Sequence, residues 1–237
     1  MQASLRLKAS EMHGCFRVAY GQRTGTTFLH HVAEGSVYVT AAHVLKGAKA
    51  GDRVLFQKNE GSLPVTLREL HFHPDGDDVC VFTSDSIRVE KFEPLDGKAG
   101  THMGDPVRFL GFPHGLGNSY PGQGFPTPLL RGALFSGVVE IKGKSLVILD
   151  GFNNPGFSGG PVYAFDEDGK ARLFGVISGY RYEQQSHGGV YRRGEAGDEE
   201  LVPDVYVKPN SGLIYCTVRA KLNDVMGLVE AFNILPD

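Results

Sequence analysis

The feature that most constrains this chain is a succession of short apolar or alternating runs, each followed by residues that favour turns. The sequence contains 32 Gly and 13 Pro in 237 residues, without the glycine period of collagen. Short runs bounded by Gly, Pro, Asp and Asn are typical of β-strands joined by turns. Such runs occur at residues 36–40, 53–57, 65–70, 79–82, 107–110, 137–141, 146–149, 161–165, 173–178 and 212–218. We therefore predict an all-β fold.

Helical periodicity is convincing only near the end of the sequence. Apolar residues recur near the 3.6-residue period at Leu222, Val225, Met226, Val229, Ala231 and Phe232. This spacing predicts a C-terminal amphipathic helix that docks on the sheets. A shorter helical turn is expected at residues 44–48.

Composition excludes several classes of protein. Apolar residues make up 41% of the chain, which is too many for a disordered protein. Lys and Arg number 24 and Asp and Glu number 27, so the net charge of −3 leaves no overall basic footprint for nucleic acid. No apolar run approaches the roughly 18 residues that cross a bilayer. We expect neither a nucleic-acid nor a membrane partner.

The cysteines and the start of the sequence favour a cytoplasmic protein. Cys15, Cys80 and Cys216 are widely spaced, and no Cys-x-x-Cys pair suggests a structural zinc site. The first residues, MQASLRLKASEM, lack the apolar run of a signal peptide. We expect three reduced, mostly buried thiols.

A serine surrounded by glycine and proline, at residues 153–161 (NNPGFSGGP), is the strongest candidate for chemistry. Glycines let a main chain approach its neighbours closely and turn its N–H groups inward. The N–H groups of Gly156 and Ser158 would then form an oxyanion hole, with Ser158 as the nucleophile. The alternative is a plain Gly-Pro-rich hairpin loop.

A serine hydroxyl needs a base, and the base needs an orienting carboxylate. His43 closes an apolar run that ends in small residues, TAAHV, and is the candidate base. Asp78 is the last carboxylate before the apolar run VCVF, so we expect it to be buried and paired with His43. We expect Asp75 and Asp77 to face water.

These strings together resemble a known family. The set TAAHV, DVCVF and PGFSGGP, in the order His43, Asp78, Ser158, resembles the trypsin-like (chymotrypsin-fold) serine proteases. Residues 104–117, the Asn-Pro-Gly at 154–156 and residues 25–29 look similar to the protease domain of the HtrA/Deg type, here without a PDZ domain.

The resemblance implies two packed six-stranded antiparallel β-barrels with the catalytic groups between them and a C-terminal α-helix. The first barrel, residues 12–100, would carry His43 and Asp78, and the second, residues 101–220, would carry Ser158. Residues 221–237 would form the helix and tail.

The resemblance also places a substrate pocket. Its floor would be Phe152, and its wall would be Ser178, Gly179 and Tyr180, whose main chain would bind an extended peptide. Because Phe152 is not an acid, cleavage after Lys or Arg is not expected. The alternative for Phe152 is a buried core aromatic.

Two other segments have weaker patterns. Residues 181–204 are polar, Gly-rich and charged, and read as a long surface loop that is a mobile lid, a regulatory partner site or an insertion without a role. His71, His73, Asp75 and Asp77 could suggest a metal site, but a structural turn is the favoured interpretation, and we expect no metal or other cofactor.

The sequence therefore predicts a serine endopeptidase that acts on protein or peptide substrates. The competing hypothesis is a latent or inactive protease-fold binding module, since an intact triad does not guarantee an assembled oxyanion hole.

Overall fold

The first half of the chain forms one curled antiparallel sheet in the computed structural model, which describes residues 7, 12–32, 35–84, 101–141, 143–182, 188–193, 198–207 and 210–228. Its strands are β1 (Cys15–Tyr20), β2 (Arg23–Val32), β3 (Gly35–Thr40), β4 (Arg53–Gln57), β5 (Ser62–Thr66), β6 (Leu70–Phe72) and β7 (Cys80–Phe82). They pair in the order β5-β4-β1-β2-β3-β7-β6.

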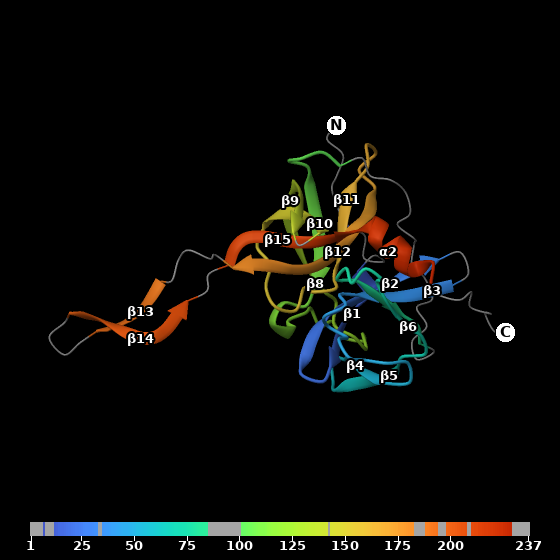
Figure 1. Ribbon diagram of the computed structural model, residues 1–237. Coiled ribbons are helices and arrows are strands. Elements are labelled where there is room, and N and C mark those ends of the chain that lie inside the picture. The colour runs from blue at the N-terminus through green and yellow to red at the C-terminus, as the bar shows by residue number, and fades with distance from the viewer. Residues whose placement is uncertain are drawn as a thin grey trace.

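The second half forms a closed barrel of six strands, in the order β10-β15-β12-β11-β8-β9. The strands are β8 (Pro106–Gly111), β9 (Leu129–Ile141), β10 (Lys144–Gly151), β11 (Pro161–Phe165), β12 (Ala171–Tyr182) and β15 (Asn210–Val218). A 3-10 turn, η1 (Pro113–Gly115), follows β8, and one helix, α2 (Arg219–Met226), follows β15. In Figure 1 the barrel lies above the curled sheet, and α2 lies between the two.

A core shared by both halves joins the sheet to the barrel. The sheet contributes Cys15, Phe28, Val37, Val39, Val79 and Val81, the barrel contributes Leu110, Tyr163, Ala171, Leu173 and Val176, and the helix adds Leu222 and Val225. Each half also has a core of its own. Burial of these apolar side chains is the main free-energy gain on docking of the halves.

The predicted architecture is confirmed, with one difference in the first half. It is a chymotrypsin-like fold, but the first sheet has seven strands in the described chain rather than the six of a closed barrel. The expected strand at 65–70 is wrong, since β5 ends at Thr66 and β6 begins at Leu70. The boundary near residues 90–100 lies outside the described residues.

The helical expectations are partly confirmed. Helix α2 begins at Arg219, before the expected Leu222, and Leu222 and Val225 are its buried residues. Residues 229–237 lie outside the described part. The short helical turn expected at residues 44–48 corresponds to two hydrogen-bonded turns, in which Val44 N–H donates to the Ala41 carbonyl and Ala48 N–H donates to the Leu45 carbonyl.

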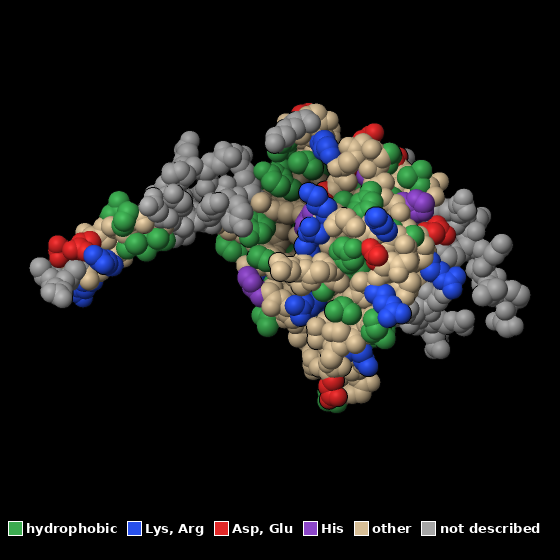
Figure 2. Space-filling model, turned by 60° about the horizontal axis from the view of Figure 1, so that its bottom comes forward, with side chains coloured by type: hydrophobic (Ala, Val, Ile, Leu, Met, Phe, Trp, Pro, Cys, Tyr) green, Lys and Arg blue, Asp and Glu red, His purple; other side chains and the backbone are tan. Residues whose placement is uncertain are grey.

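The segment expected to be a long loop contains a two-stranded ribbon. Strands β13 (Gly188–Arg193) and β14 (Glu199–Val207) pair with each other and project away from the rest of the molecule (Figure 1). Apolar side chains of the ribbon lie nearer its base, and charged ones lie towards its tip (Figure 2). The prediction of a long loop there is wrong for these residues, because β13 and β14 pair as antiparallel strands.

No helix in the described residues is long and apolar enough to cross a membrane. The three cysteines are buried and form no disulfide with one another, as predicted. Burial raises the pKa of the Cys216 thiol to about 12, and it also raises the pKa of Cys15 and of Cys80.

Candidate active site

His43 follows the end of β3 and is held against Asp78 by two hydrogen bonds. Its ring Nδ1 lies 2.8 Å from Asp78 Oδ2, and its main-chain N–H donates to Asp78 Oδ1 at 2.9 Å. Both carboxylate oxygens therefore bind the same residue. The ring's other nitrogen, Nε2, is left for a reacting group, which is the arrangement that a base of this kind needs.

Asp78 also accepts a hydrogen bond from the barrel. The hydroxyl of Ser178 on β12 donates to Asp78 Oδ2 at 2.5 Å. Burial raises the pKa of Asp78, but the hydrogen bond and charge of His43, together with the bonds from the Ser178 hydroxyl and the His43 amide, outweigh burial and leave that pKa below its ordinary value. Asp78 is thus poised to stay anionic.

The loop of Ser158 fits between the two halves only because the residues after the serine are glycines. Gly159 has φ +85°, and a Cβ there would lie 2.2 Å from the Thr26 carbonyl oxygen of the first sheet. A Cβ on Gly160 would lie 2.0 Å from the Leu110 carbonyl oxygen of the barrel. The close approach to the first sheet allows Thr26 N–H to donate to the Ser158 carbonyl at 2.8 Å. The close main-chain approach predicted from the motif is therefore present.

The Ser158 hydroxyl is directed to the main chain of β12. Its oxygen is 3.5 Å from the Ser178 carbonyl oxygen. In the described part of the chain no hydrogen bond joins it to His43. Catalytic hydrogen bonds are often long without substrate and tighten when substrate binds.

The peptide between Pro155 and Gly156 is oriented by the turn η1. The Pro155 carbonyl accepts a hydrogen bond from His114 N–H at 2.8 Å. Because a trans peptide is planar, the Gly156 N–H points the opposite way. The Gly156 carbonyl is held by the Thr26 hydroxyl at 2.7 Å. Within the described residues, the amides of Gly156 and Ser158 donate to no protein acceptor, so both are available to an oxyanion.

His114 holds this peptide with an unusual backbone. Its φ of 51° makes it the one non-glycine residue at positive φ among the described residues. Such strain costs of order 1–3 kcal/mol and persists where the surroundings fix it. The sequence analysis did not single out His114 for this role, since nothing in its neighbours predicts a left-handed histidine.

The residues predicted to form the wall and the floor of the pocket differ in burial. Ser178, Gly179 and Tyr180 lie on β12 and are half-buried. Phe152 follows β10 and is 54% exposed, so its interpretation as a buried core aromatic is wrong. No contact in the structure tests the assignment of Phe152 as a pocket floor.

A buried asparagine that the sequence analysis missed connects the segment after β10 to β12 by a hydrogen bond. Asn153 is 1% exposed, and its Nδ2 donates to the Gly179 carbonyl at 3.3 Å. Asn210 Nδ2 in turn donates to the Asn153 carbonyl at 2.5 Å. Asn153 Oδ1 has no hydrogen-bond partner in the described structure.

An open apolar depression of about 400 Å³ lies beside His43. It is lined by Ala42, His43, Lys46, Gly47 and Phe72.

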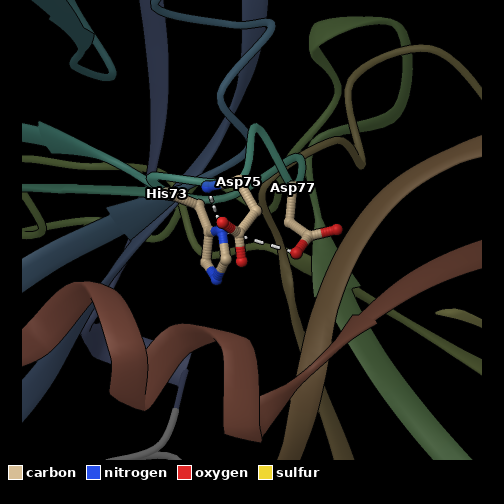
Figure 3. A group of neighbouring side chains, drawn as sticks. All are labelled: His73, Asp75 and Asp77. Atoms are coloured by element: carbon tan, nitrogen blue, oxygen red, sulfur yellow. Dashed lines mark hydrogen bonds and ion pairs between the residues drawn. The ribbon is translucent and has the colours of Figure 1, made fainter. Parts of the chain in front are cut away.

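The residues considered for a metal site form a cluster with its own cation. Ligand atoms of His73, Asp75 and Asp77 lie within 4.8 Å of one another (Figure 3). The Asp75 N–H donates to His73 Nδ1 at 3.2 Å, and Lys221 Nζ lies 3.2 Å from Asp77 Oδ2. A metal ion would have to displace both. Asp75 is exposed as expected, but the expectation that Asp77 faces water is wrong, because its carboxylate is paired and buried.

Comparison with known proteins agrees with this geometry. The sequence matches the model of the trypsin-like peptidase domain over residues 25–176. No curated protein matches it significantly.

Two solved structures show the same fold at low sequence identity. One is the inactive form of a serine-to-alanine variant of Rv3671c from M. tuberculosis H37Rv, which is 15% identical with a TM-score of 0.58, over 96% of this chain and 92% of that one. The other is the HtrA-type protease AlgW with a tripeptide, which is 16% identical with a TM-score of 0.57, over 94% of this chain and 62% of that one. With more than half of its residues matched, the chain belongs to the family of trypsin-like peptidase domains.

Proposed function

We propose that this protein is a serine endopeptidase that uses Ser158, His43 and Asp78. The observation that carries the proposal is the double hydrogen bond between His43 and Asp78, which fixes the imidazole with Nδ1 towards the carboxylate. The unpartnered amides of Gly156 and Ser158 in the described structure support an oxyanion hole next to the nucleophile.

The reaction would proceed through an acyl-enzyme. Ser158 Oγ attacks the scissile carbonyl carbon, and its proton passes to His43 Nε2. The amides of Gly156 and Ser158 stabilise the oxyanion that forms. The C–N bond then breaks, and the leaving amine takes the proton from His43. Water, with His43 as base, hydrolyses the Ser158 ester and restores the hydroxyl. Asp78 stays anionic throughout and stabilises the imidazolium.

The proposed substrate is a protein or peptide in extended form, bound along Ser178, Gly179 and Tyr180. Phe152 supplies no negative charge at the predicted floor, so the proposal excludes a preference for Lys or Arg before the cleaved bond. The three cysteines form no disulfide with one another, which suits a reducing compartment, and we propose a cytoplasmic location on that ground.

A second candidate is a latent form of the same protease. The contact of Ser158 Oγ with the Ser178 carbonyl, instead of with His43, favours it. In this form a substrate or regulatory partner would be needed to turn the hydroxyl towards His43. The ribbon of β13 and β14 continues from the substrate wall on β12, so residues 181–204 are the place where such a partner would act.

Reaction with a fluorophosphonate, read by intact mass, tests both candidates. The active enzyme gives a single adduct, and Ser158→Ala gives none. No adduct on folded protein would overturn the proposal of a constitutive protease and favour the latent form. A peptide library then checks the residue before the cleaved bond, where dominant cleavage after Lys or Arg would contradict the assigned pocket.

A further inference from the structure

The loop that carries Asp78 is held from outside by charged groups of the second half. Lys221, on α2, places its Nζ 3.2 Å from Asp77 Oδ2 and 3.9 Å from Asp75 Oδ2. The Asp77 side chain is only 7% exposed. The Lys144 ammonium, at the start of β10, also donates to the Gly76 carbonyl. The Asp77–Lys221 pair is therefore a link between the loop and the barrel side of the molecule.

Lys221 is the cation that balances the buried Asp77. The other group close to this carboxylate is His73, whose Nδ1 lies 3.4 Å from Asp77 Oδ2. That nitrogen also accepts the Asp75 N–H, and the ring's Nε2 faces Asp224 Oδ2 at 3.5 Å. The hydrogen bond and charge of Asp77 raise the pKa of Lys221, which keeps the ammonium protonated.

The main chain transmits the position of Asp77 to Asp78. The Asp77 carbonyl accepts the Val79 N–H at 2.8 Å, and the Val79 carbonyl accepts the His73 N–H at 3.2 Å. These bonds close residues 73–79 into one turn, so Asp77 cannot move without moving its neighbour. A buried carboxylate without its counter-charge is costly, and it would draw the loop towards water.

The helix that supplies Lys221 is itself fixed. Leu222 and Val225 are buried in the core shared by the sheet and the barrel, and the helix contacts β7, β12 and β15. Figure 3 shows α2 running beneath the three side chains of the loop. Lys221 thus reaches the loop from a rigid element that both halves hold.

We propose that Lys221 is a positioning residue of the active site, which acts through Asp77 to keep Asp78 against His43. The proposal rests on the proposed function for its catalytic readout. It assigns the cluster of His73, Asp75 and Asp77 to alignment of the triad by a lysine, in place of metal binding.

The test compares Lys221→Met, Asp77→Asn and Lys221→Arg with the wild-type protein. The rate of fluorophosphonate labelling is expected to fall at least tenfold in the first two, and to recover to within about threefold of wild type in Lys221→Arg. With a peptide substrate, kcat should fall while KM is retained, because the substrate wall is untouched. In the double variant of Lys221→Met and Asp77→Asn, the logarithm of the labelling rate should fall by less than the sum of the two single falls. Both substitutions remove the same interaction. Lys170→Met, in an exposed turn, is the matched control.

A second readout does not depend on activity. The proton between His43 Nδ1 and Asp78 should give a strongly downfield NMR resonance, as expected for a short charge-assisted hydrogen bond. Loss or a shift of this resonance in Lys221→Met, in protein that remains folded by thermal unfolding, supports the proposal. An unchanged resonance and labelling rate overturn it, and so does an equal loss in Lys221→Arg. If the wild type does not label, the proposed function fails, and the resonance alone decides the role of Lys221.

Discussion

The loop of Ser158 and the loop of Asp78 are each secured by the opposite half of the molecule, but with different chemistry. The serine loop lies in the second half and is gripped through its main chain by Thr26 of the first sheet. The acid loop lies in the first half and is gripped through charged and hydroxyl side chains of Ser178 and Lys221. The first attachment tolerates no added Cβ, whereas the second depends on charge.

This difference shows which contacts of a site can be recognised from the sequence. A main-chain attachment requires glycine, and clustered glycines are visible in the sequence. An attachment through side chains uses ordinary residues that are distant along the chain, and nothing in the sequence marks them as partners. The following predictions test whether the two loops really differ in this way.

Asp78→Asn is expected to have the largest effect. The amide keeps the size of the side chain but removes the charge that holds and stabilises the His43 imidazolium, so kcat should fall by about 10⁴-fold. Steady-state kinetics of the two proteins, at a pH where the wild type is fully active, measure this. A loss below tenfold would mean that the acid loop does not carry the orienting group.

Gly159→Ala should destabilise the protein by about 4 kcal/mol or more, because its Cβ would lie 2.2 Å from both the Thr26 carbonyl and the Thr40 hydroxyl oxygens. Urea unfolding measures the change. Gly21→Ala is the matched control: Gly21 has φ +58°, but a Cβ there meets nothing within 4 Å. It should cost only about 1–2 kcal/mol. Equal costs would refute the close-packed attachment.

Thr26→Val tests the hydroxyl that holds the Gly156 carbonyl. The substitution preserves shape and leaves that carbonyl and the Phe112 N–H without their partner, which should cost about 1–3 kcal/mol of stability. Labelling of Ser158 should slow, because the peptide next to the oxyanion hole loses a restraint. An unchanged labelling rate with lowered stability would show that Thr26 contributes to stability but not to the reactivity of Ser158.

The smallest expected effect is on the dependence of stability on pH. The pKa of Asp78 is lowered in the folded protein, so its contribution is present above the unfolded value near 4 and is lost as pH falls through the folded value. Urea midpoints measured from pH 6 to pH 2 should therefore decline less steeply in Asp78→Asn. Parallel curves would show that the charge of Asp78 does not contribute to the stability of the folded protein.

Much of the fold and the central residues could be predicted from local patterns. Alternating runs and turn residues predicted most strands, and the glycines around Ser158 indicated a main chain that approaches its neighbours. The pairing of His43 with Asp78 was predicted from the need of a buried carboxylate for a partner, and the structure brings His43 Nδ1 within 2.8 Å of Asp78 Oδ2.

The failures at the site concern partners far apart along the chain. Asp77 was expected in water because its neighbours are polar, and its partner Lys221 lies on the helix after the last strand. The Ser178 hydroxyl and Asn153 carry long-range hydrogen bonds that no local pattern indicates. The ribbon was missed because its charged, Gly-rich composition is also typical of loops.

The hydrogen bond from Thr26 to Gly156 also determines at which stage of folding the serine loop acquires its final shape. Thr26 and Gly156 are 130 positions apart, and the contact between them exists only after the sheet and the barrel have met. A chain that has folded one half, or has come partly apart, lacks the restraint that shapes the reactive loop. The proposed activity would therefore require both halves to be folded and in contact, so a partly folded copy would not be active.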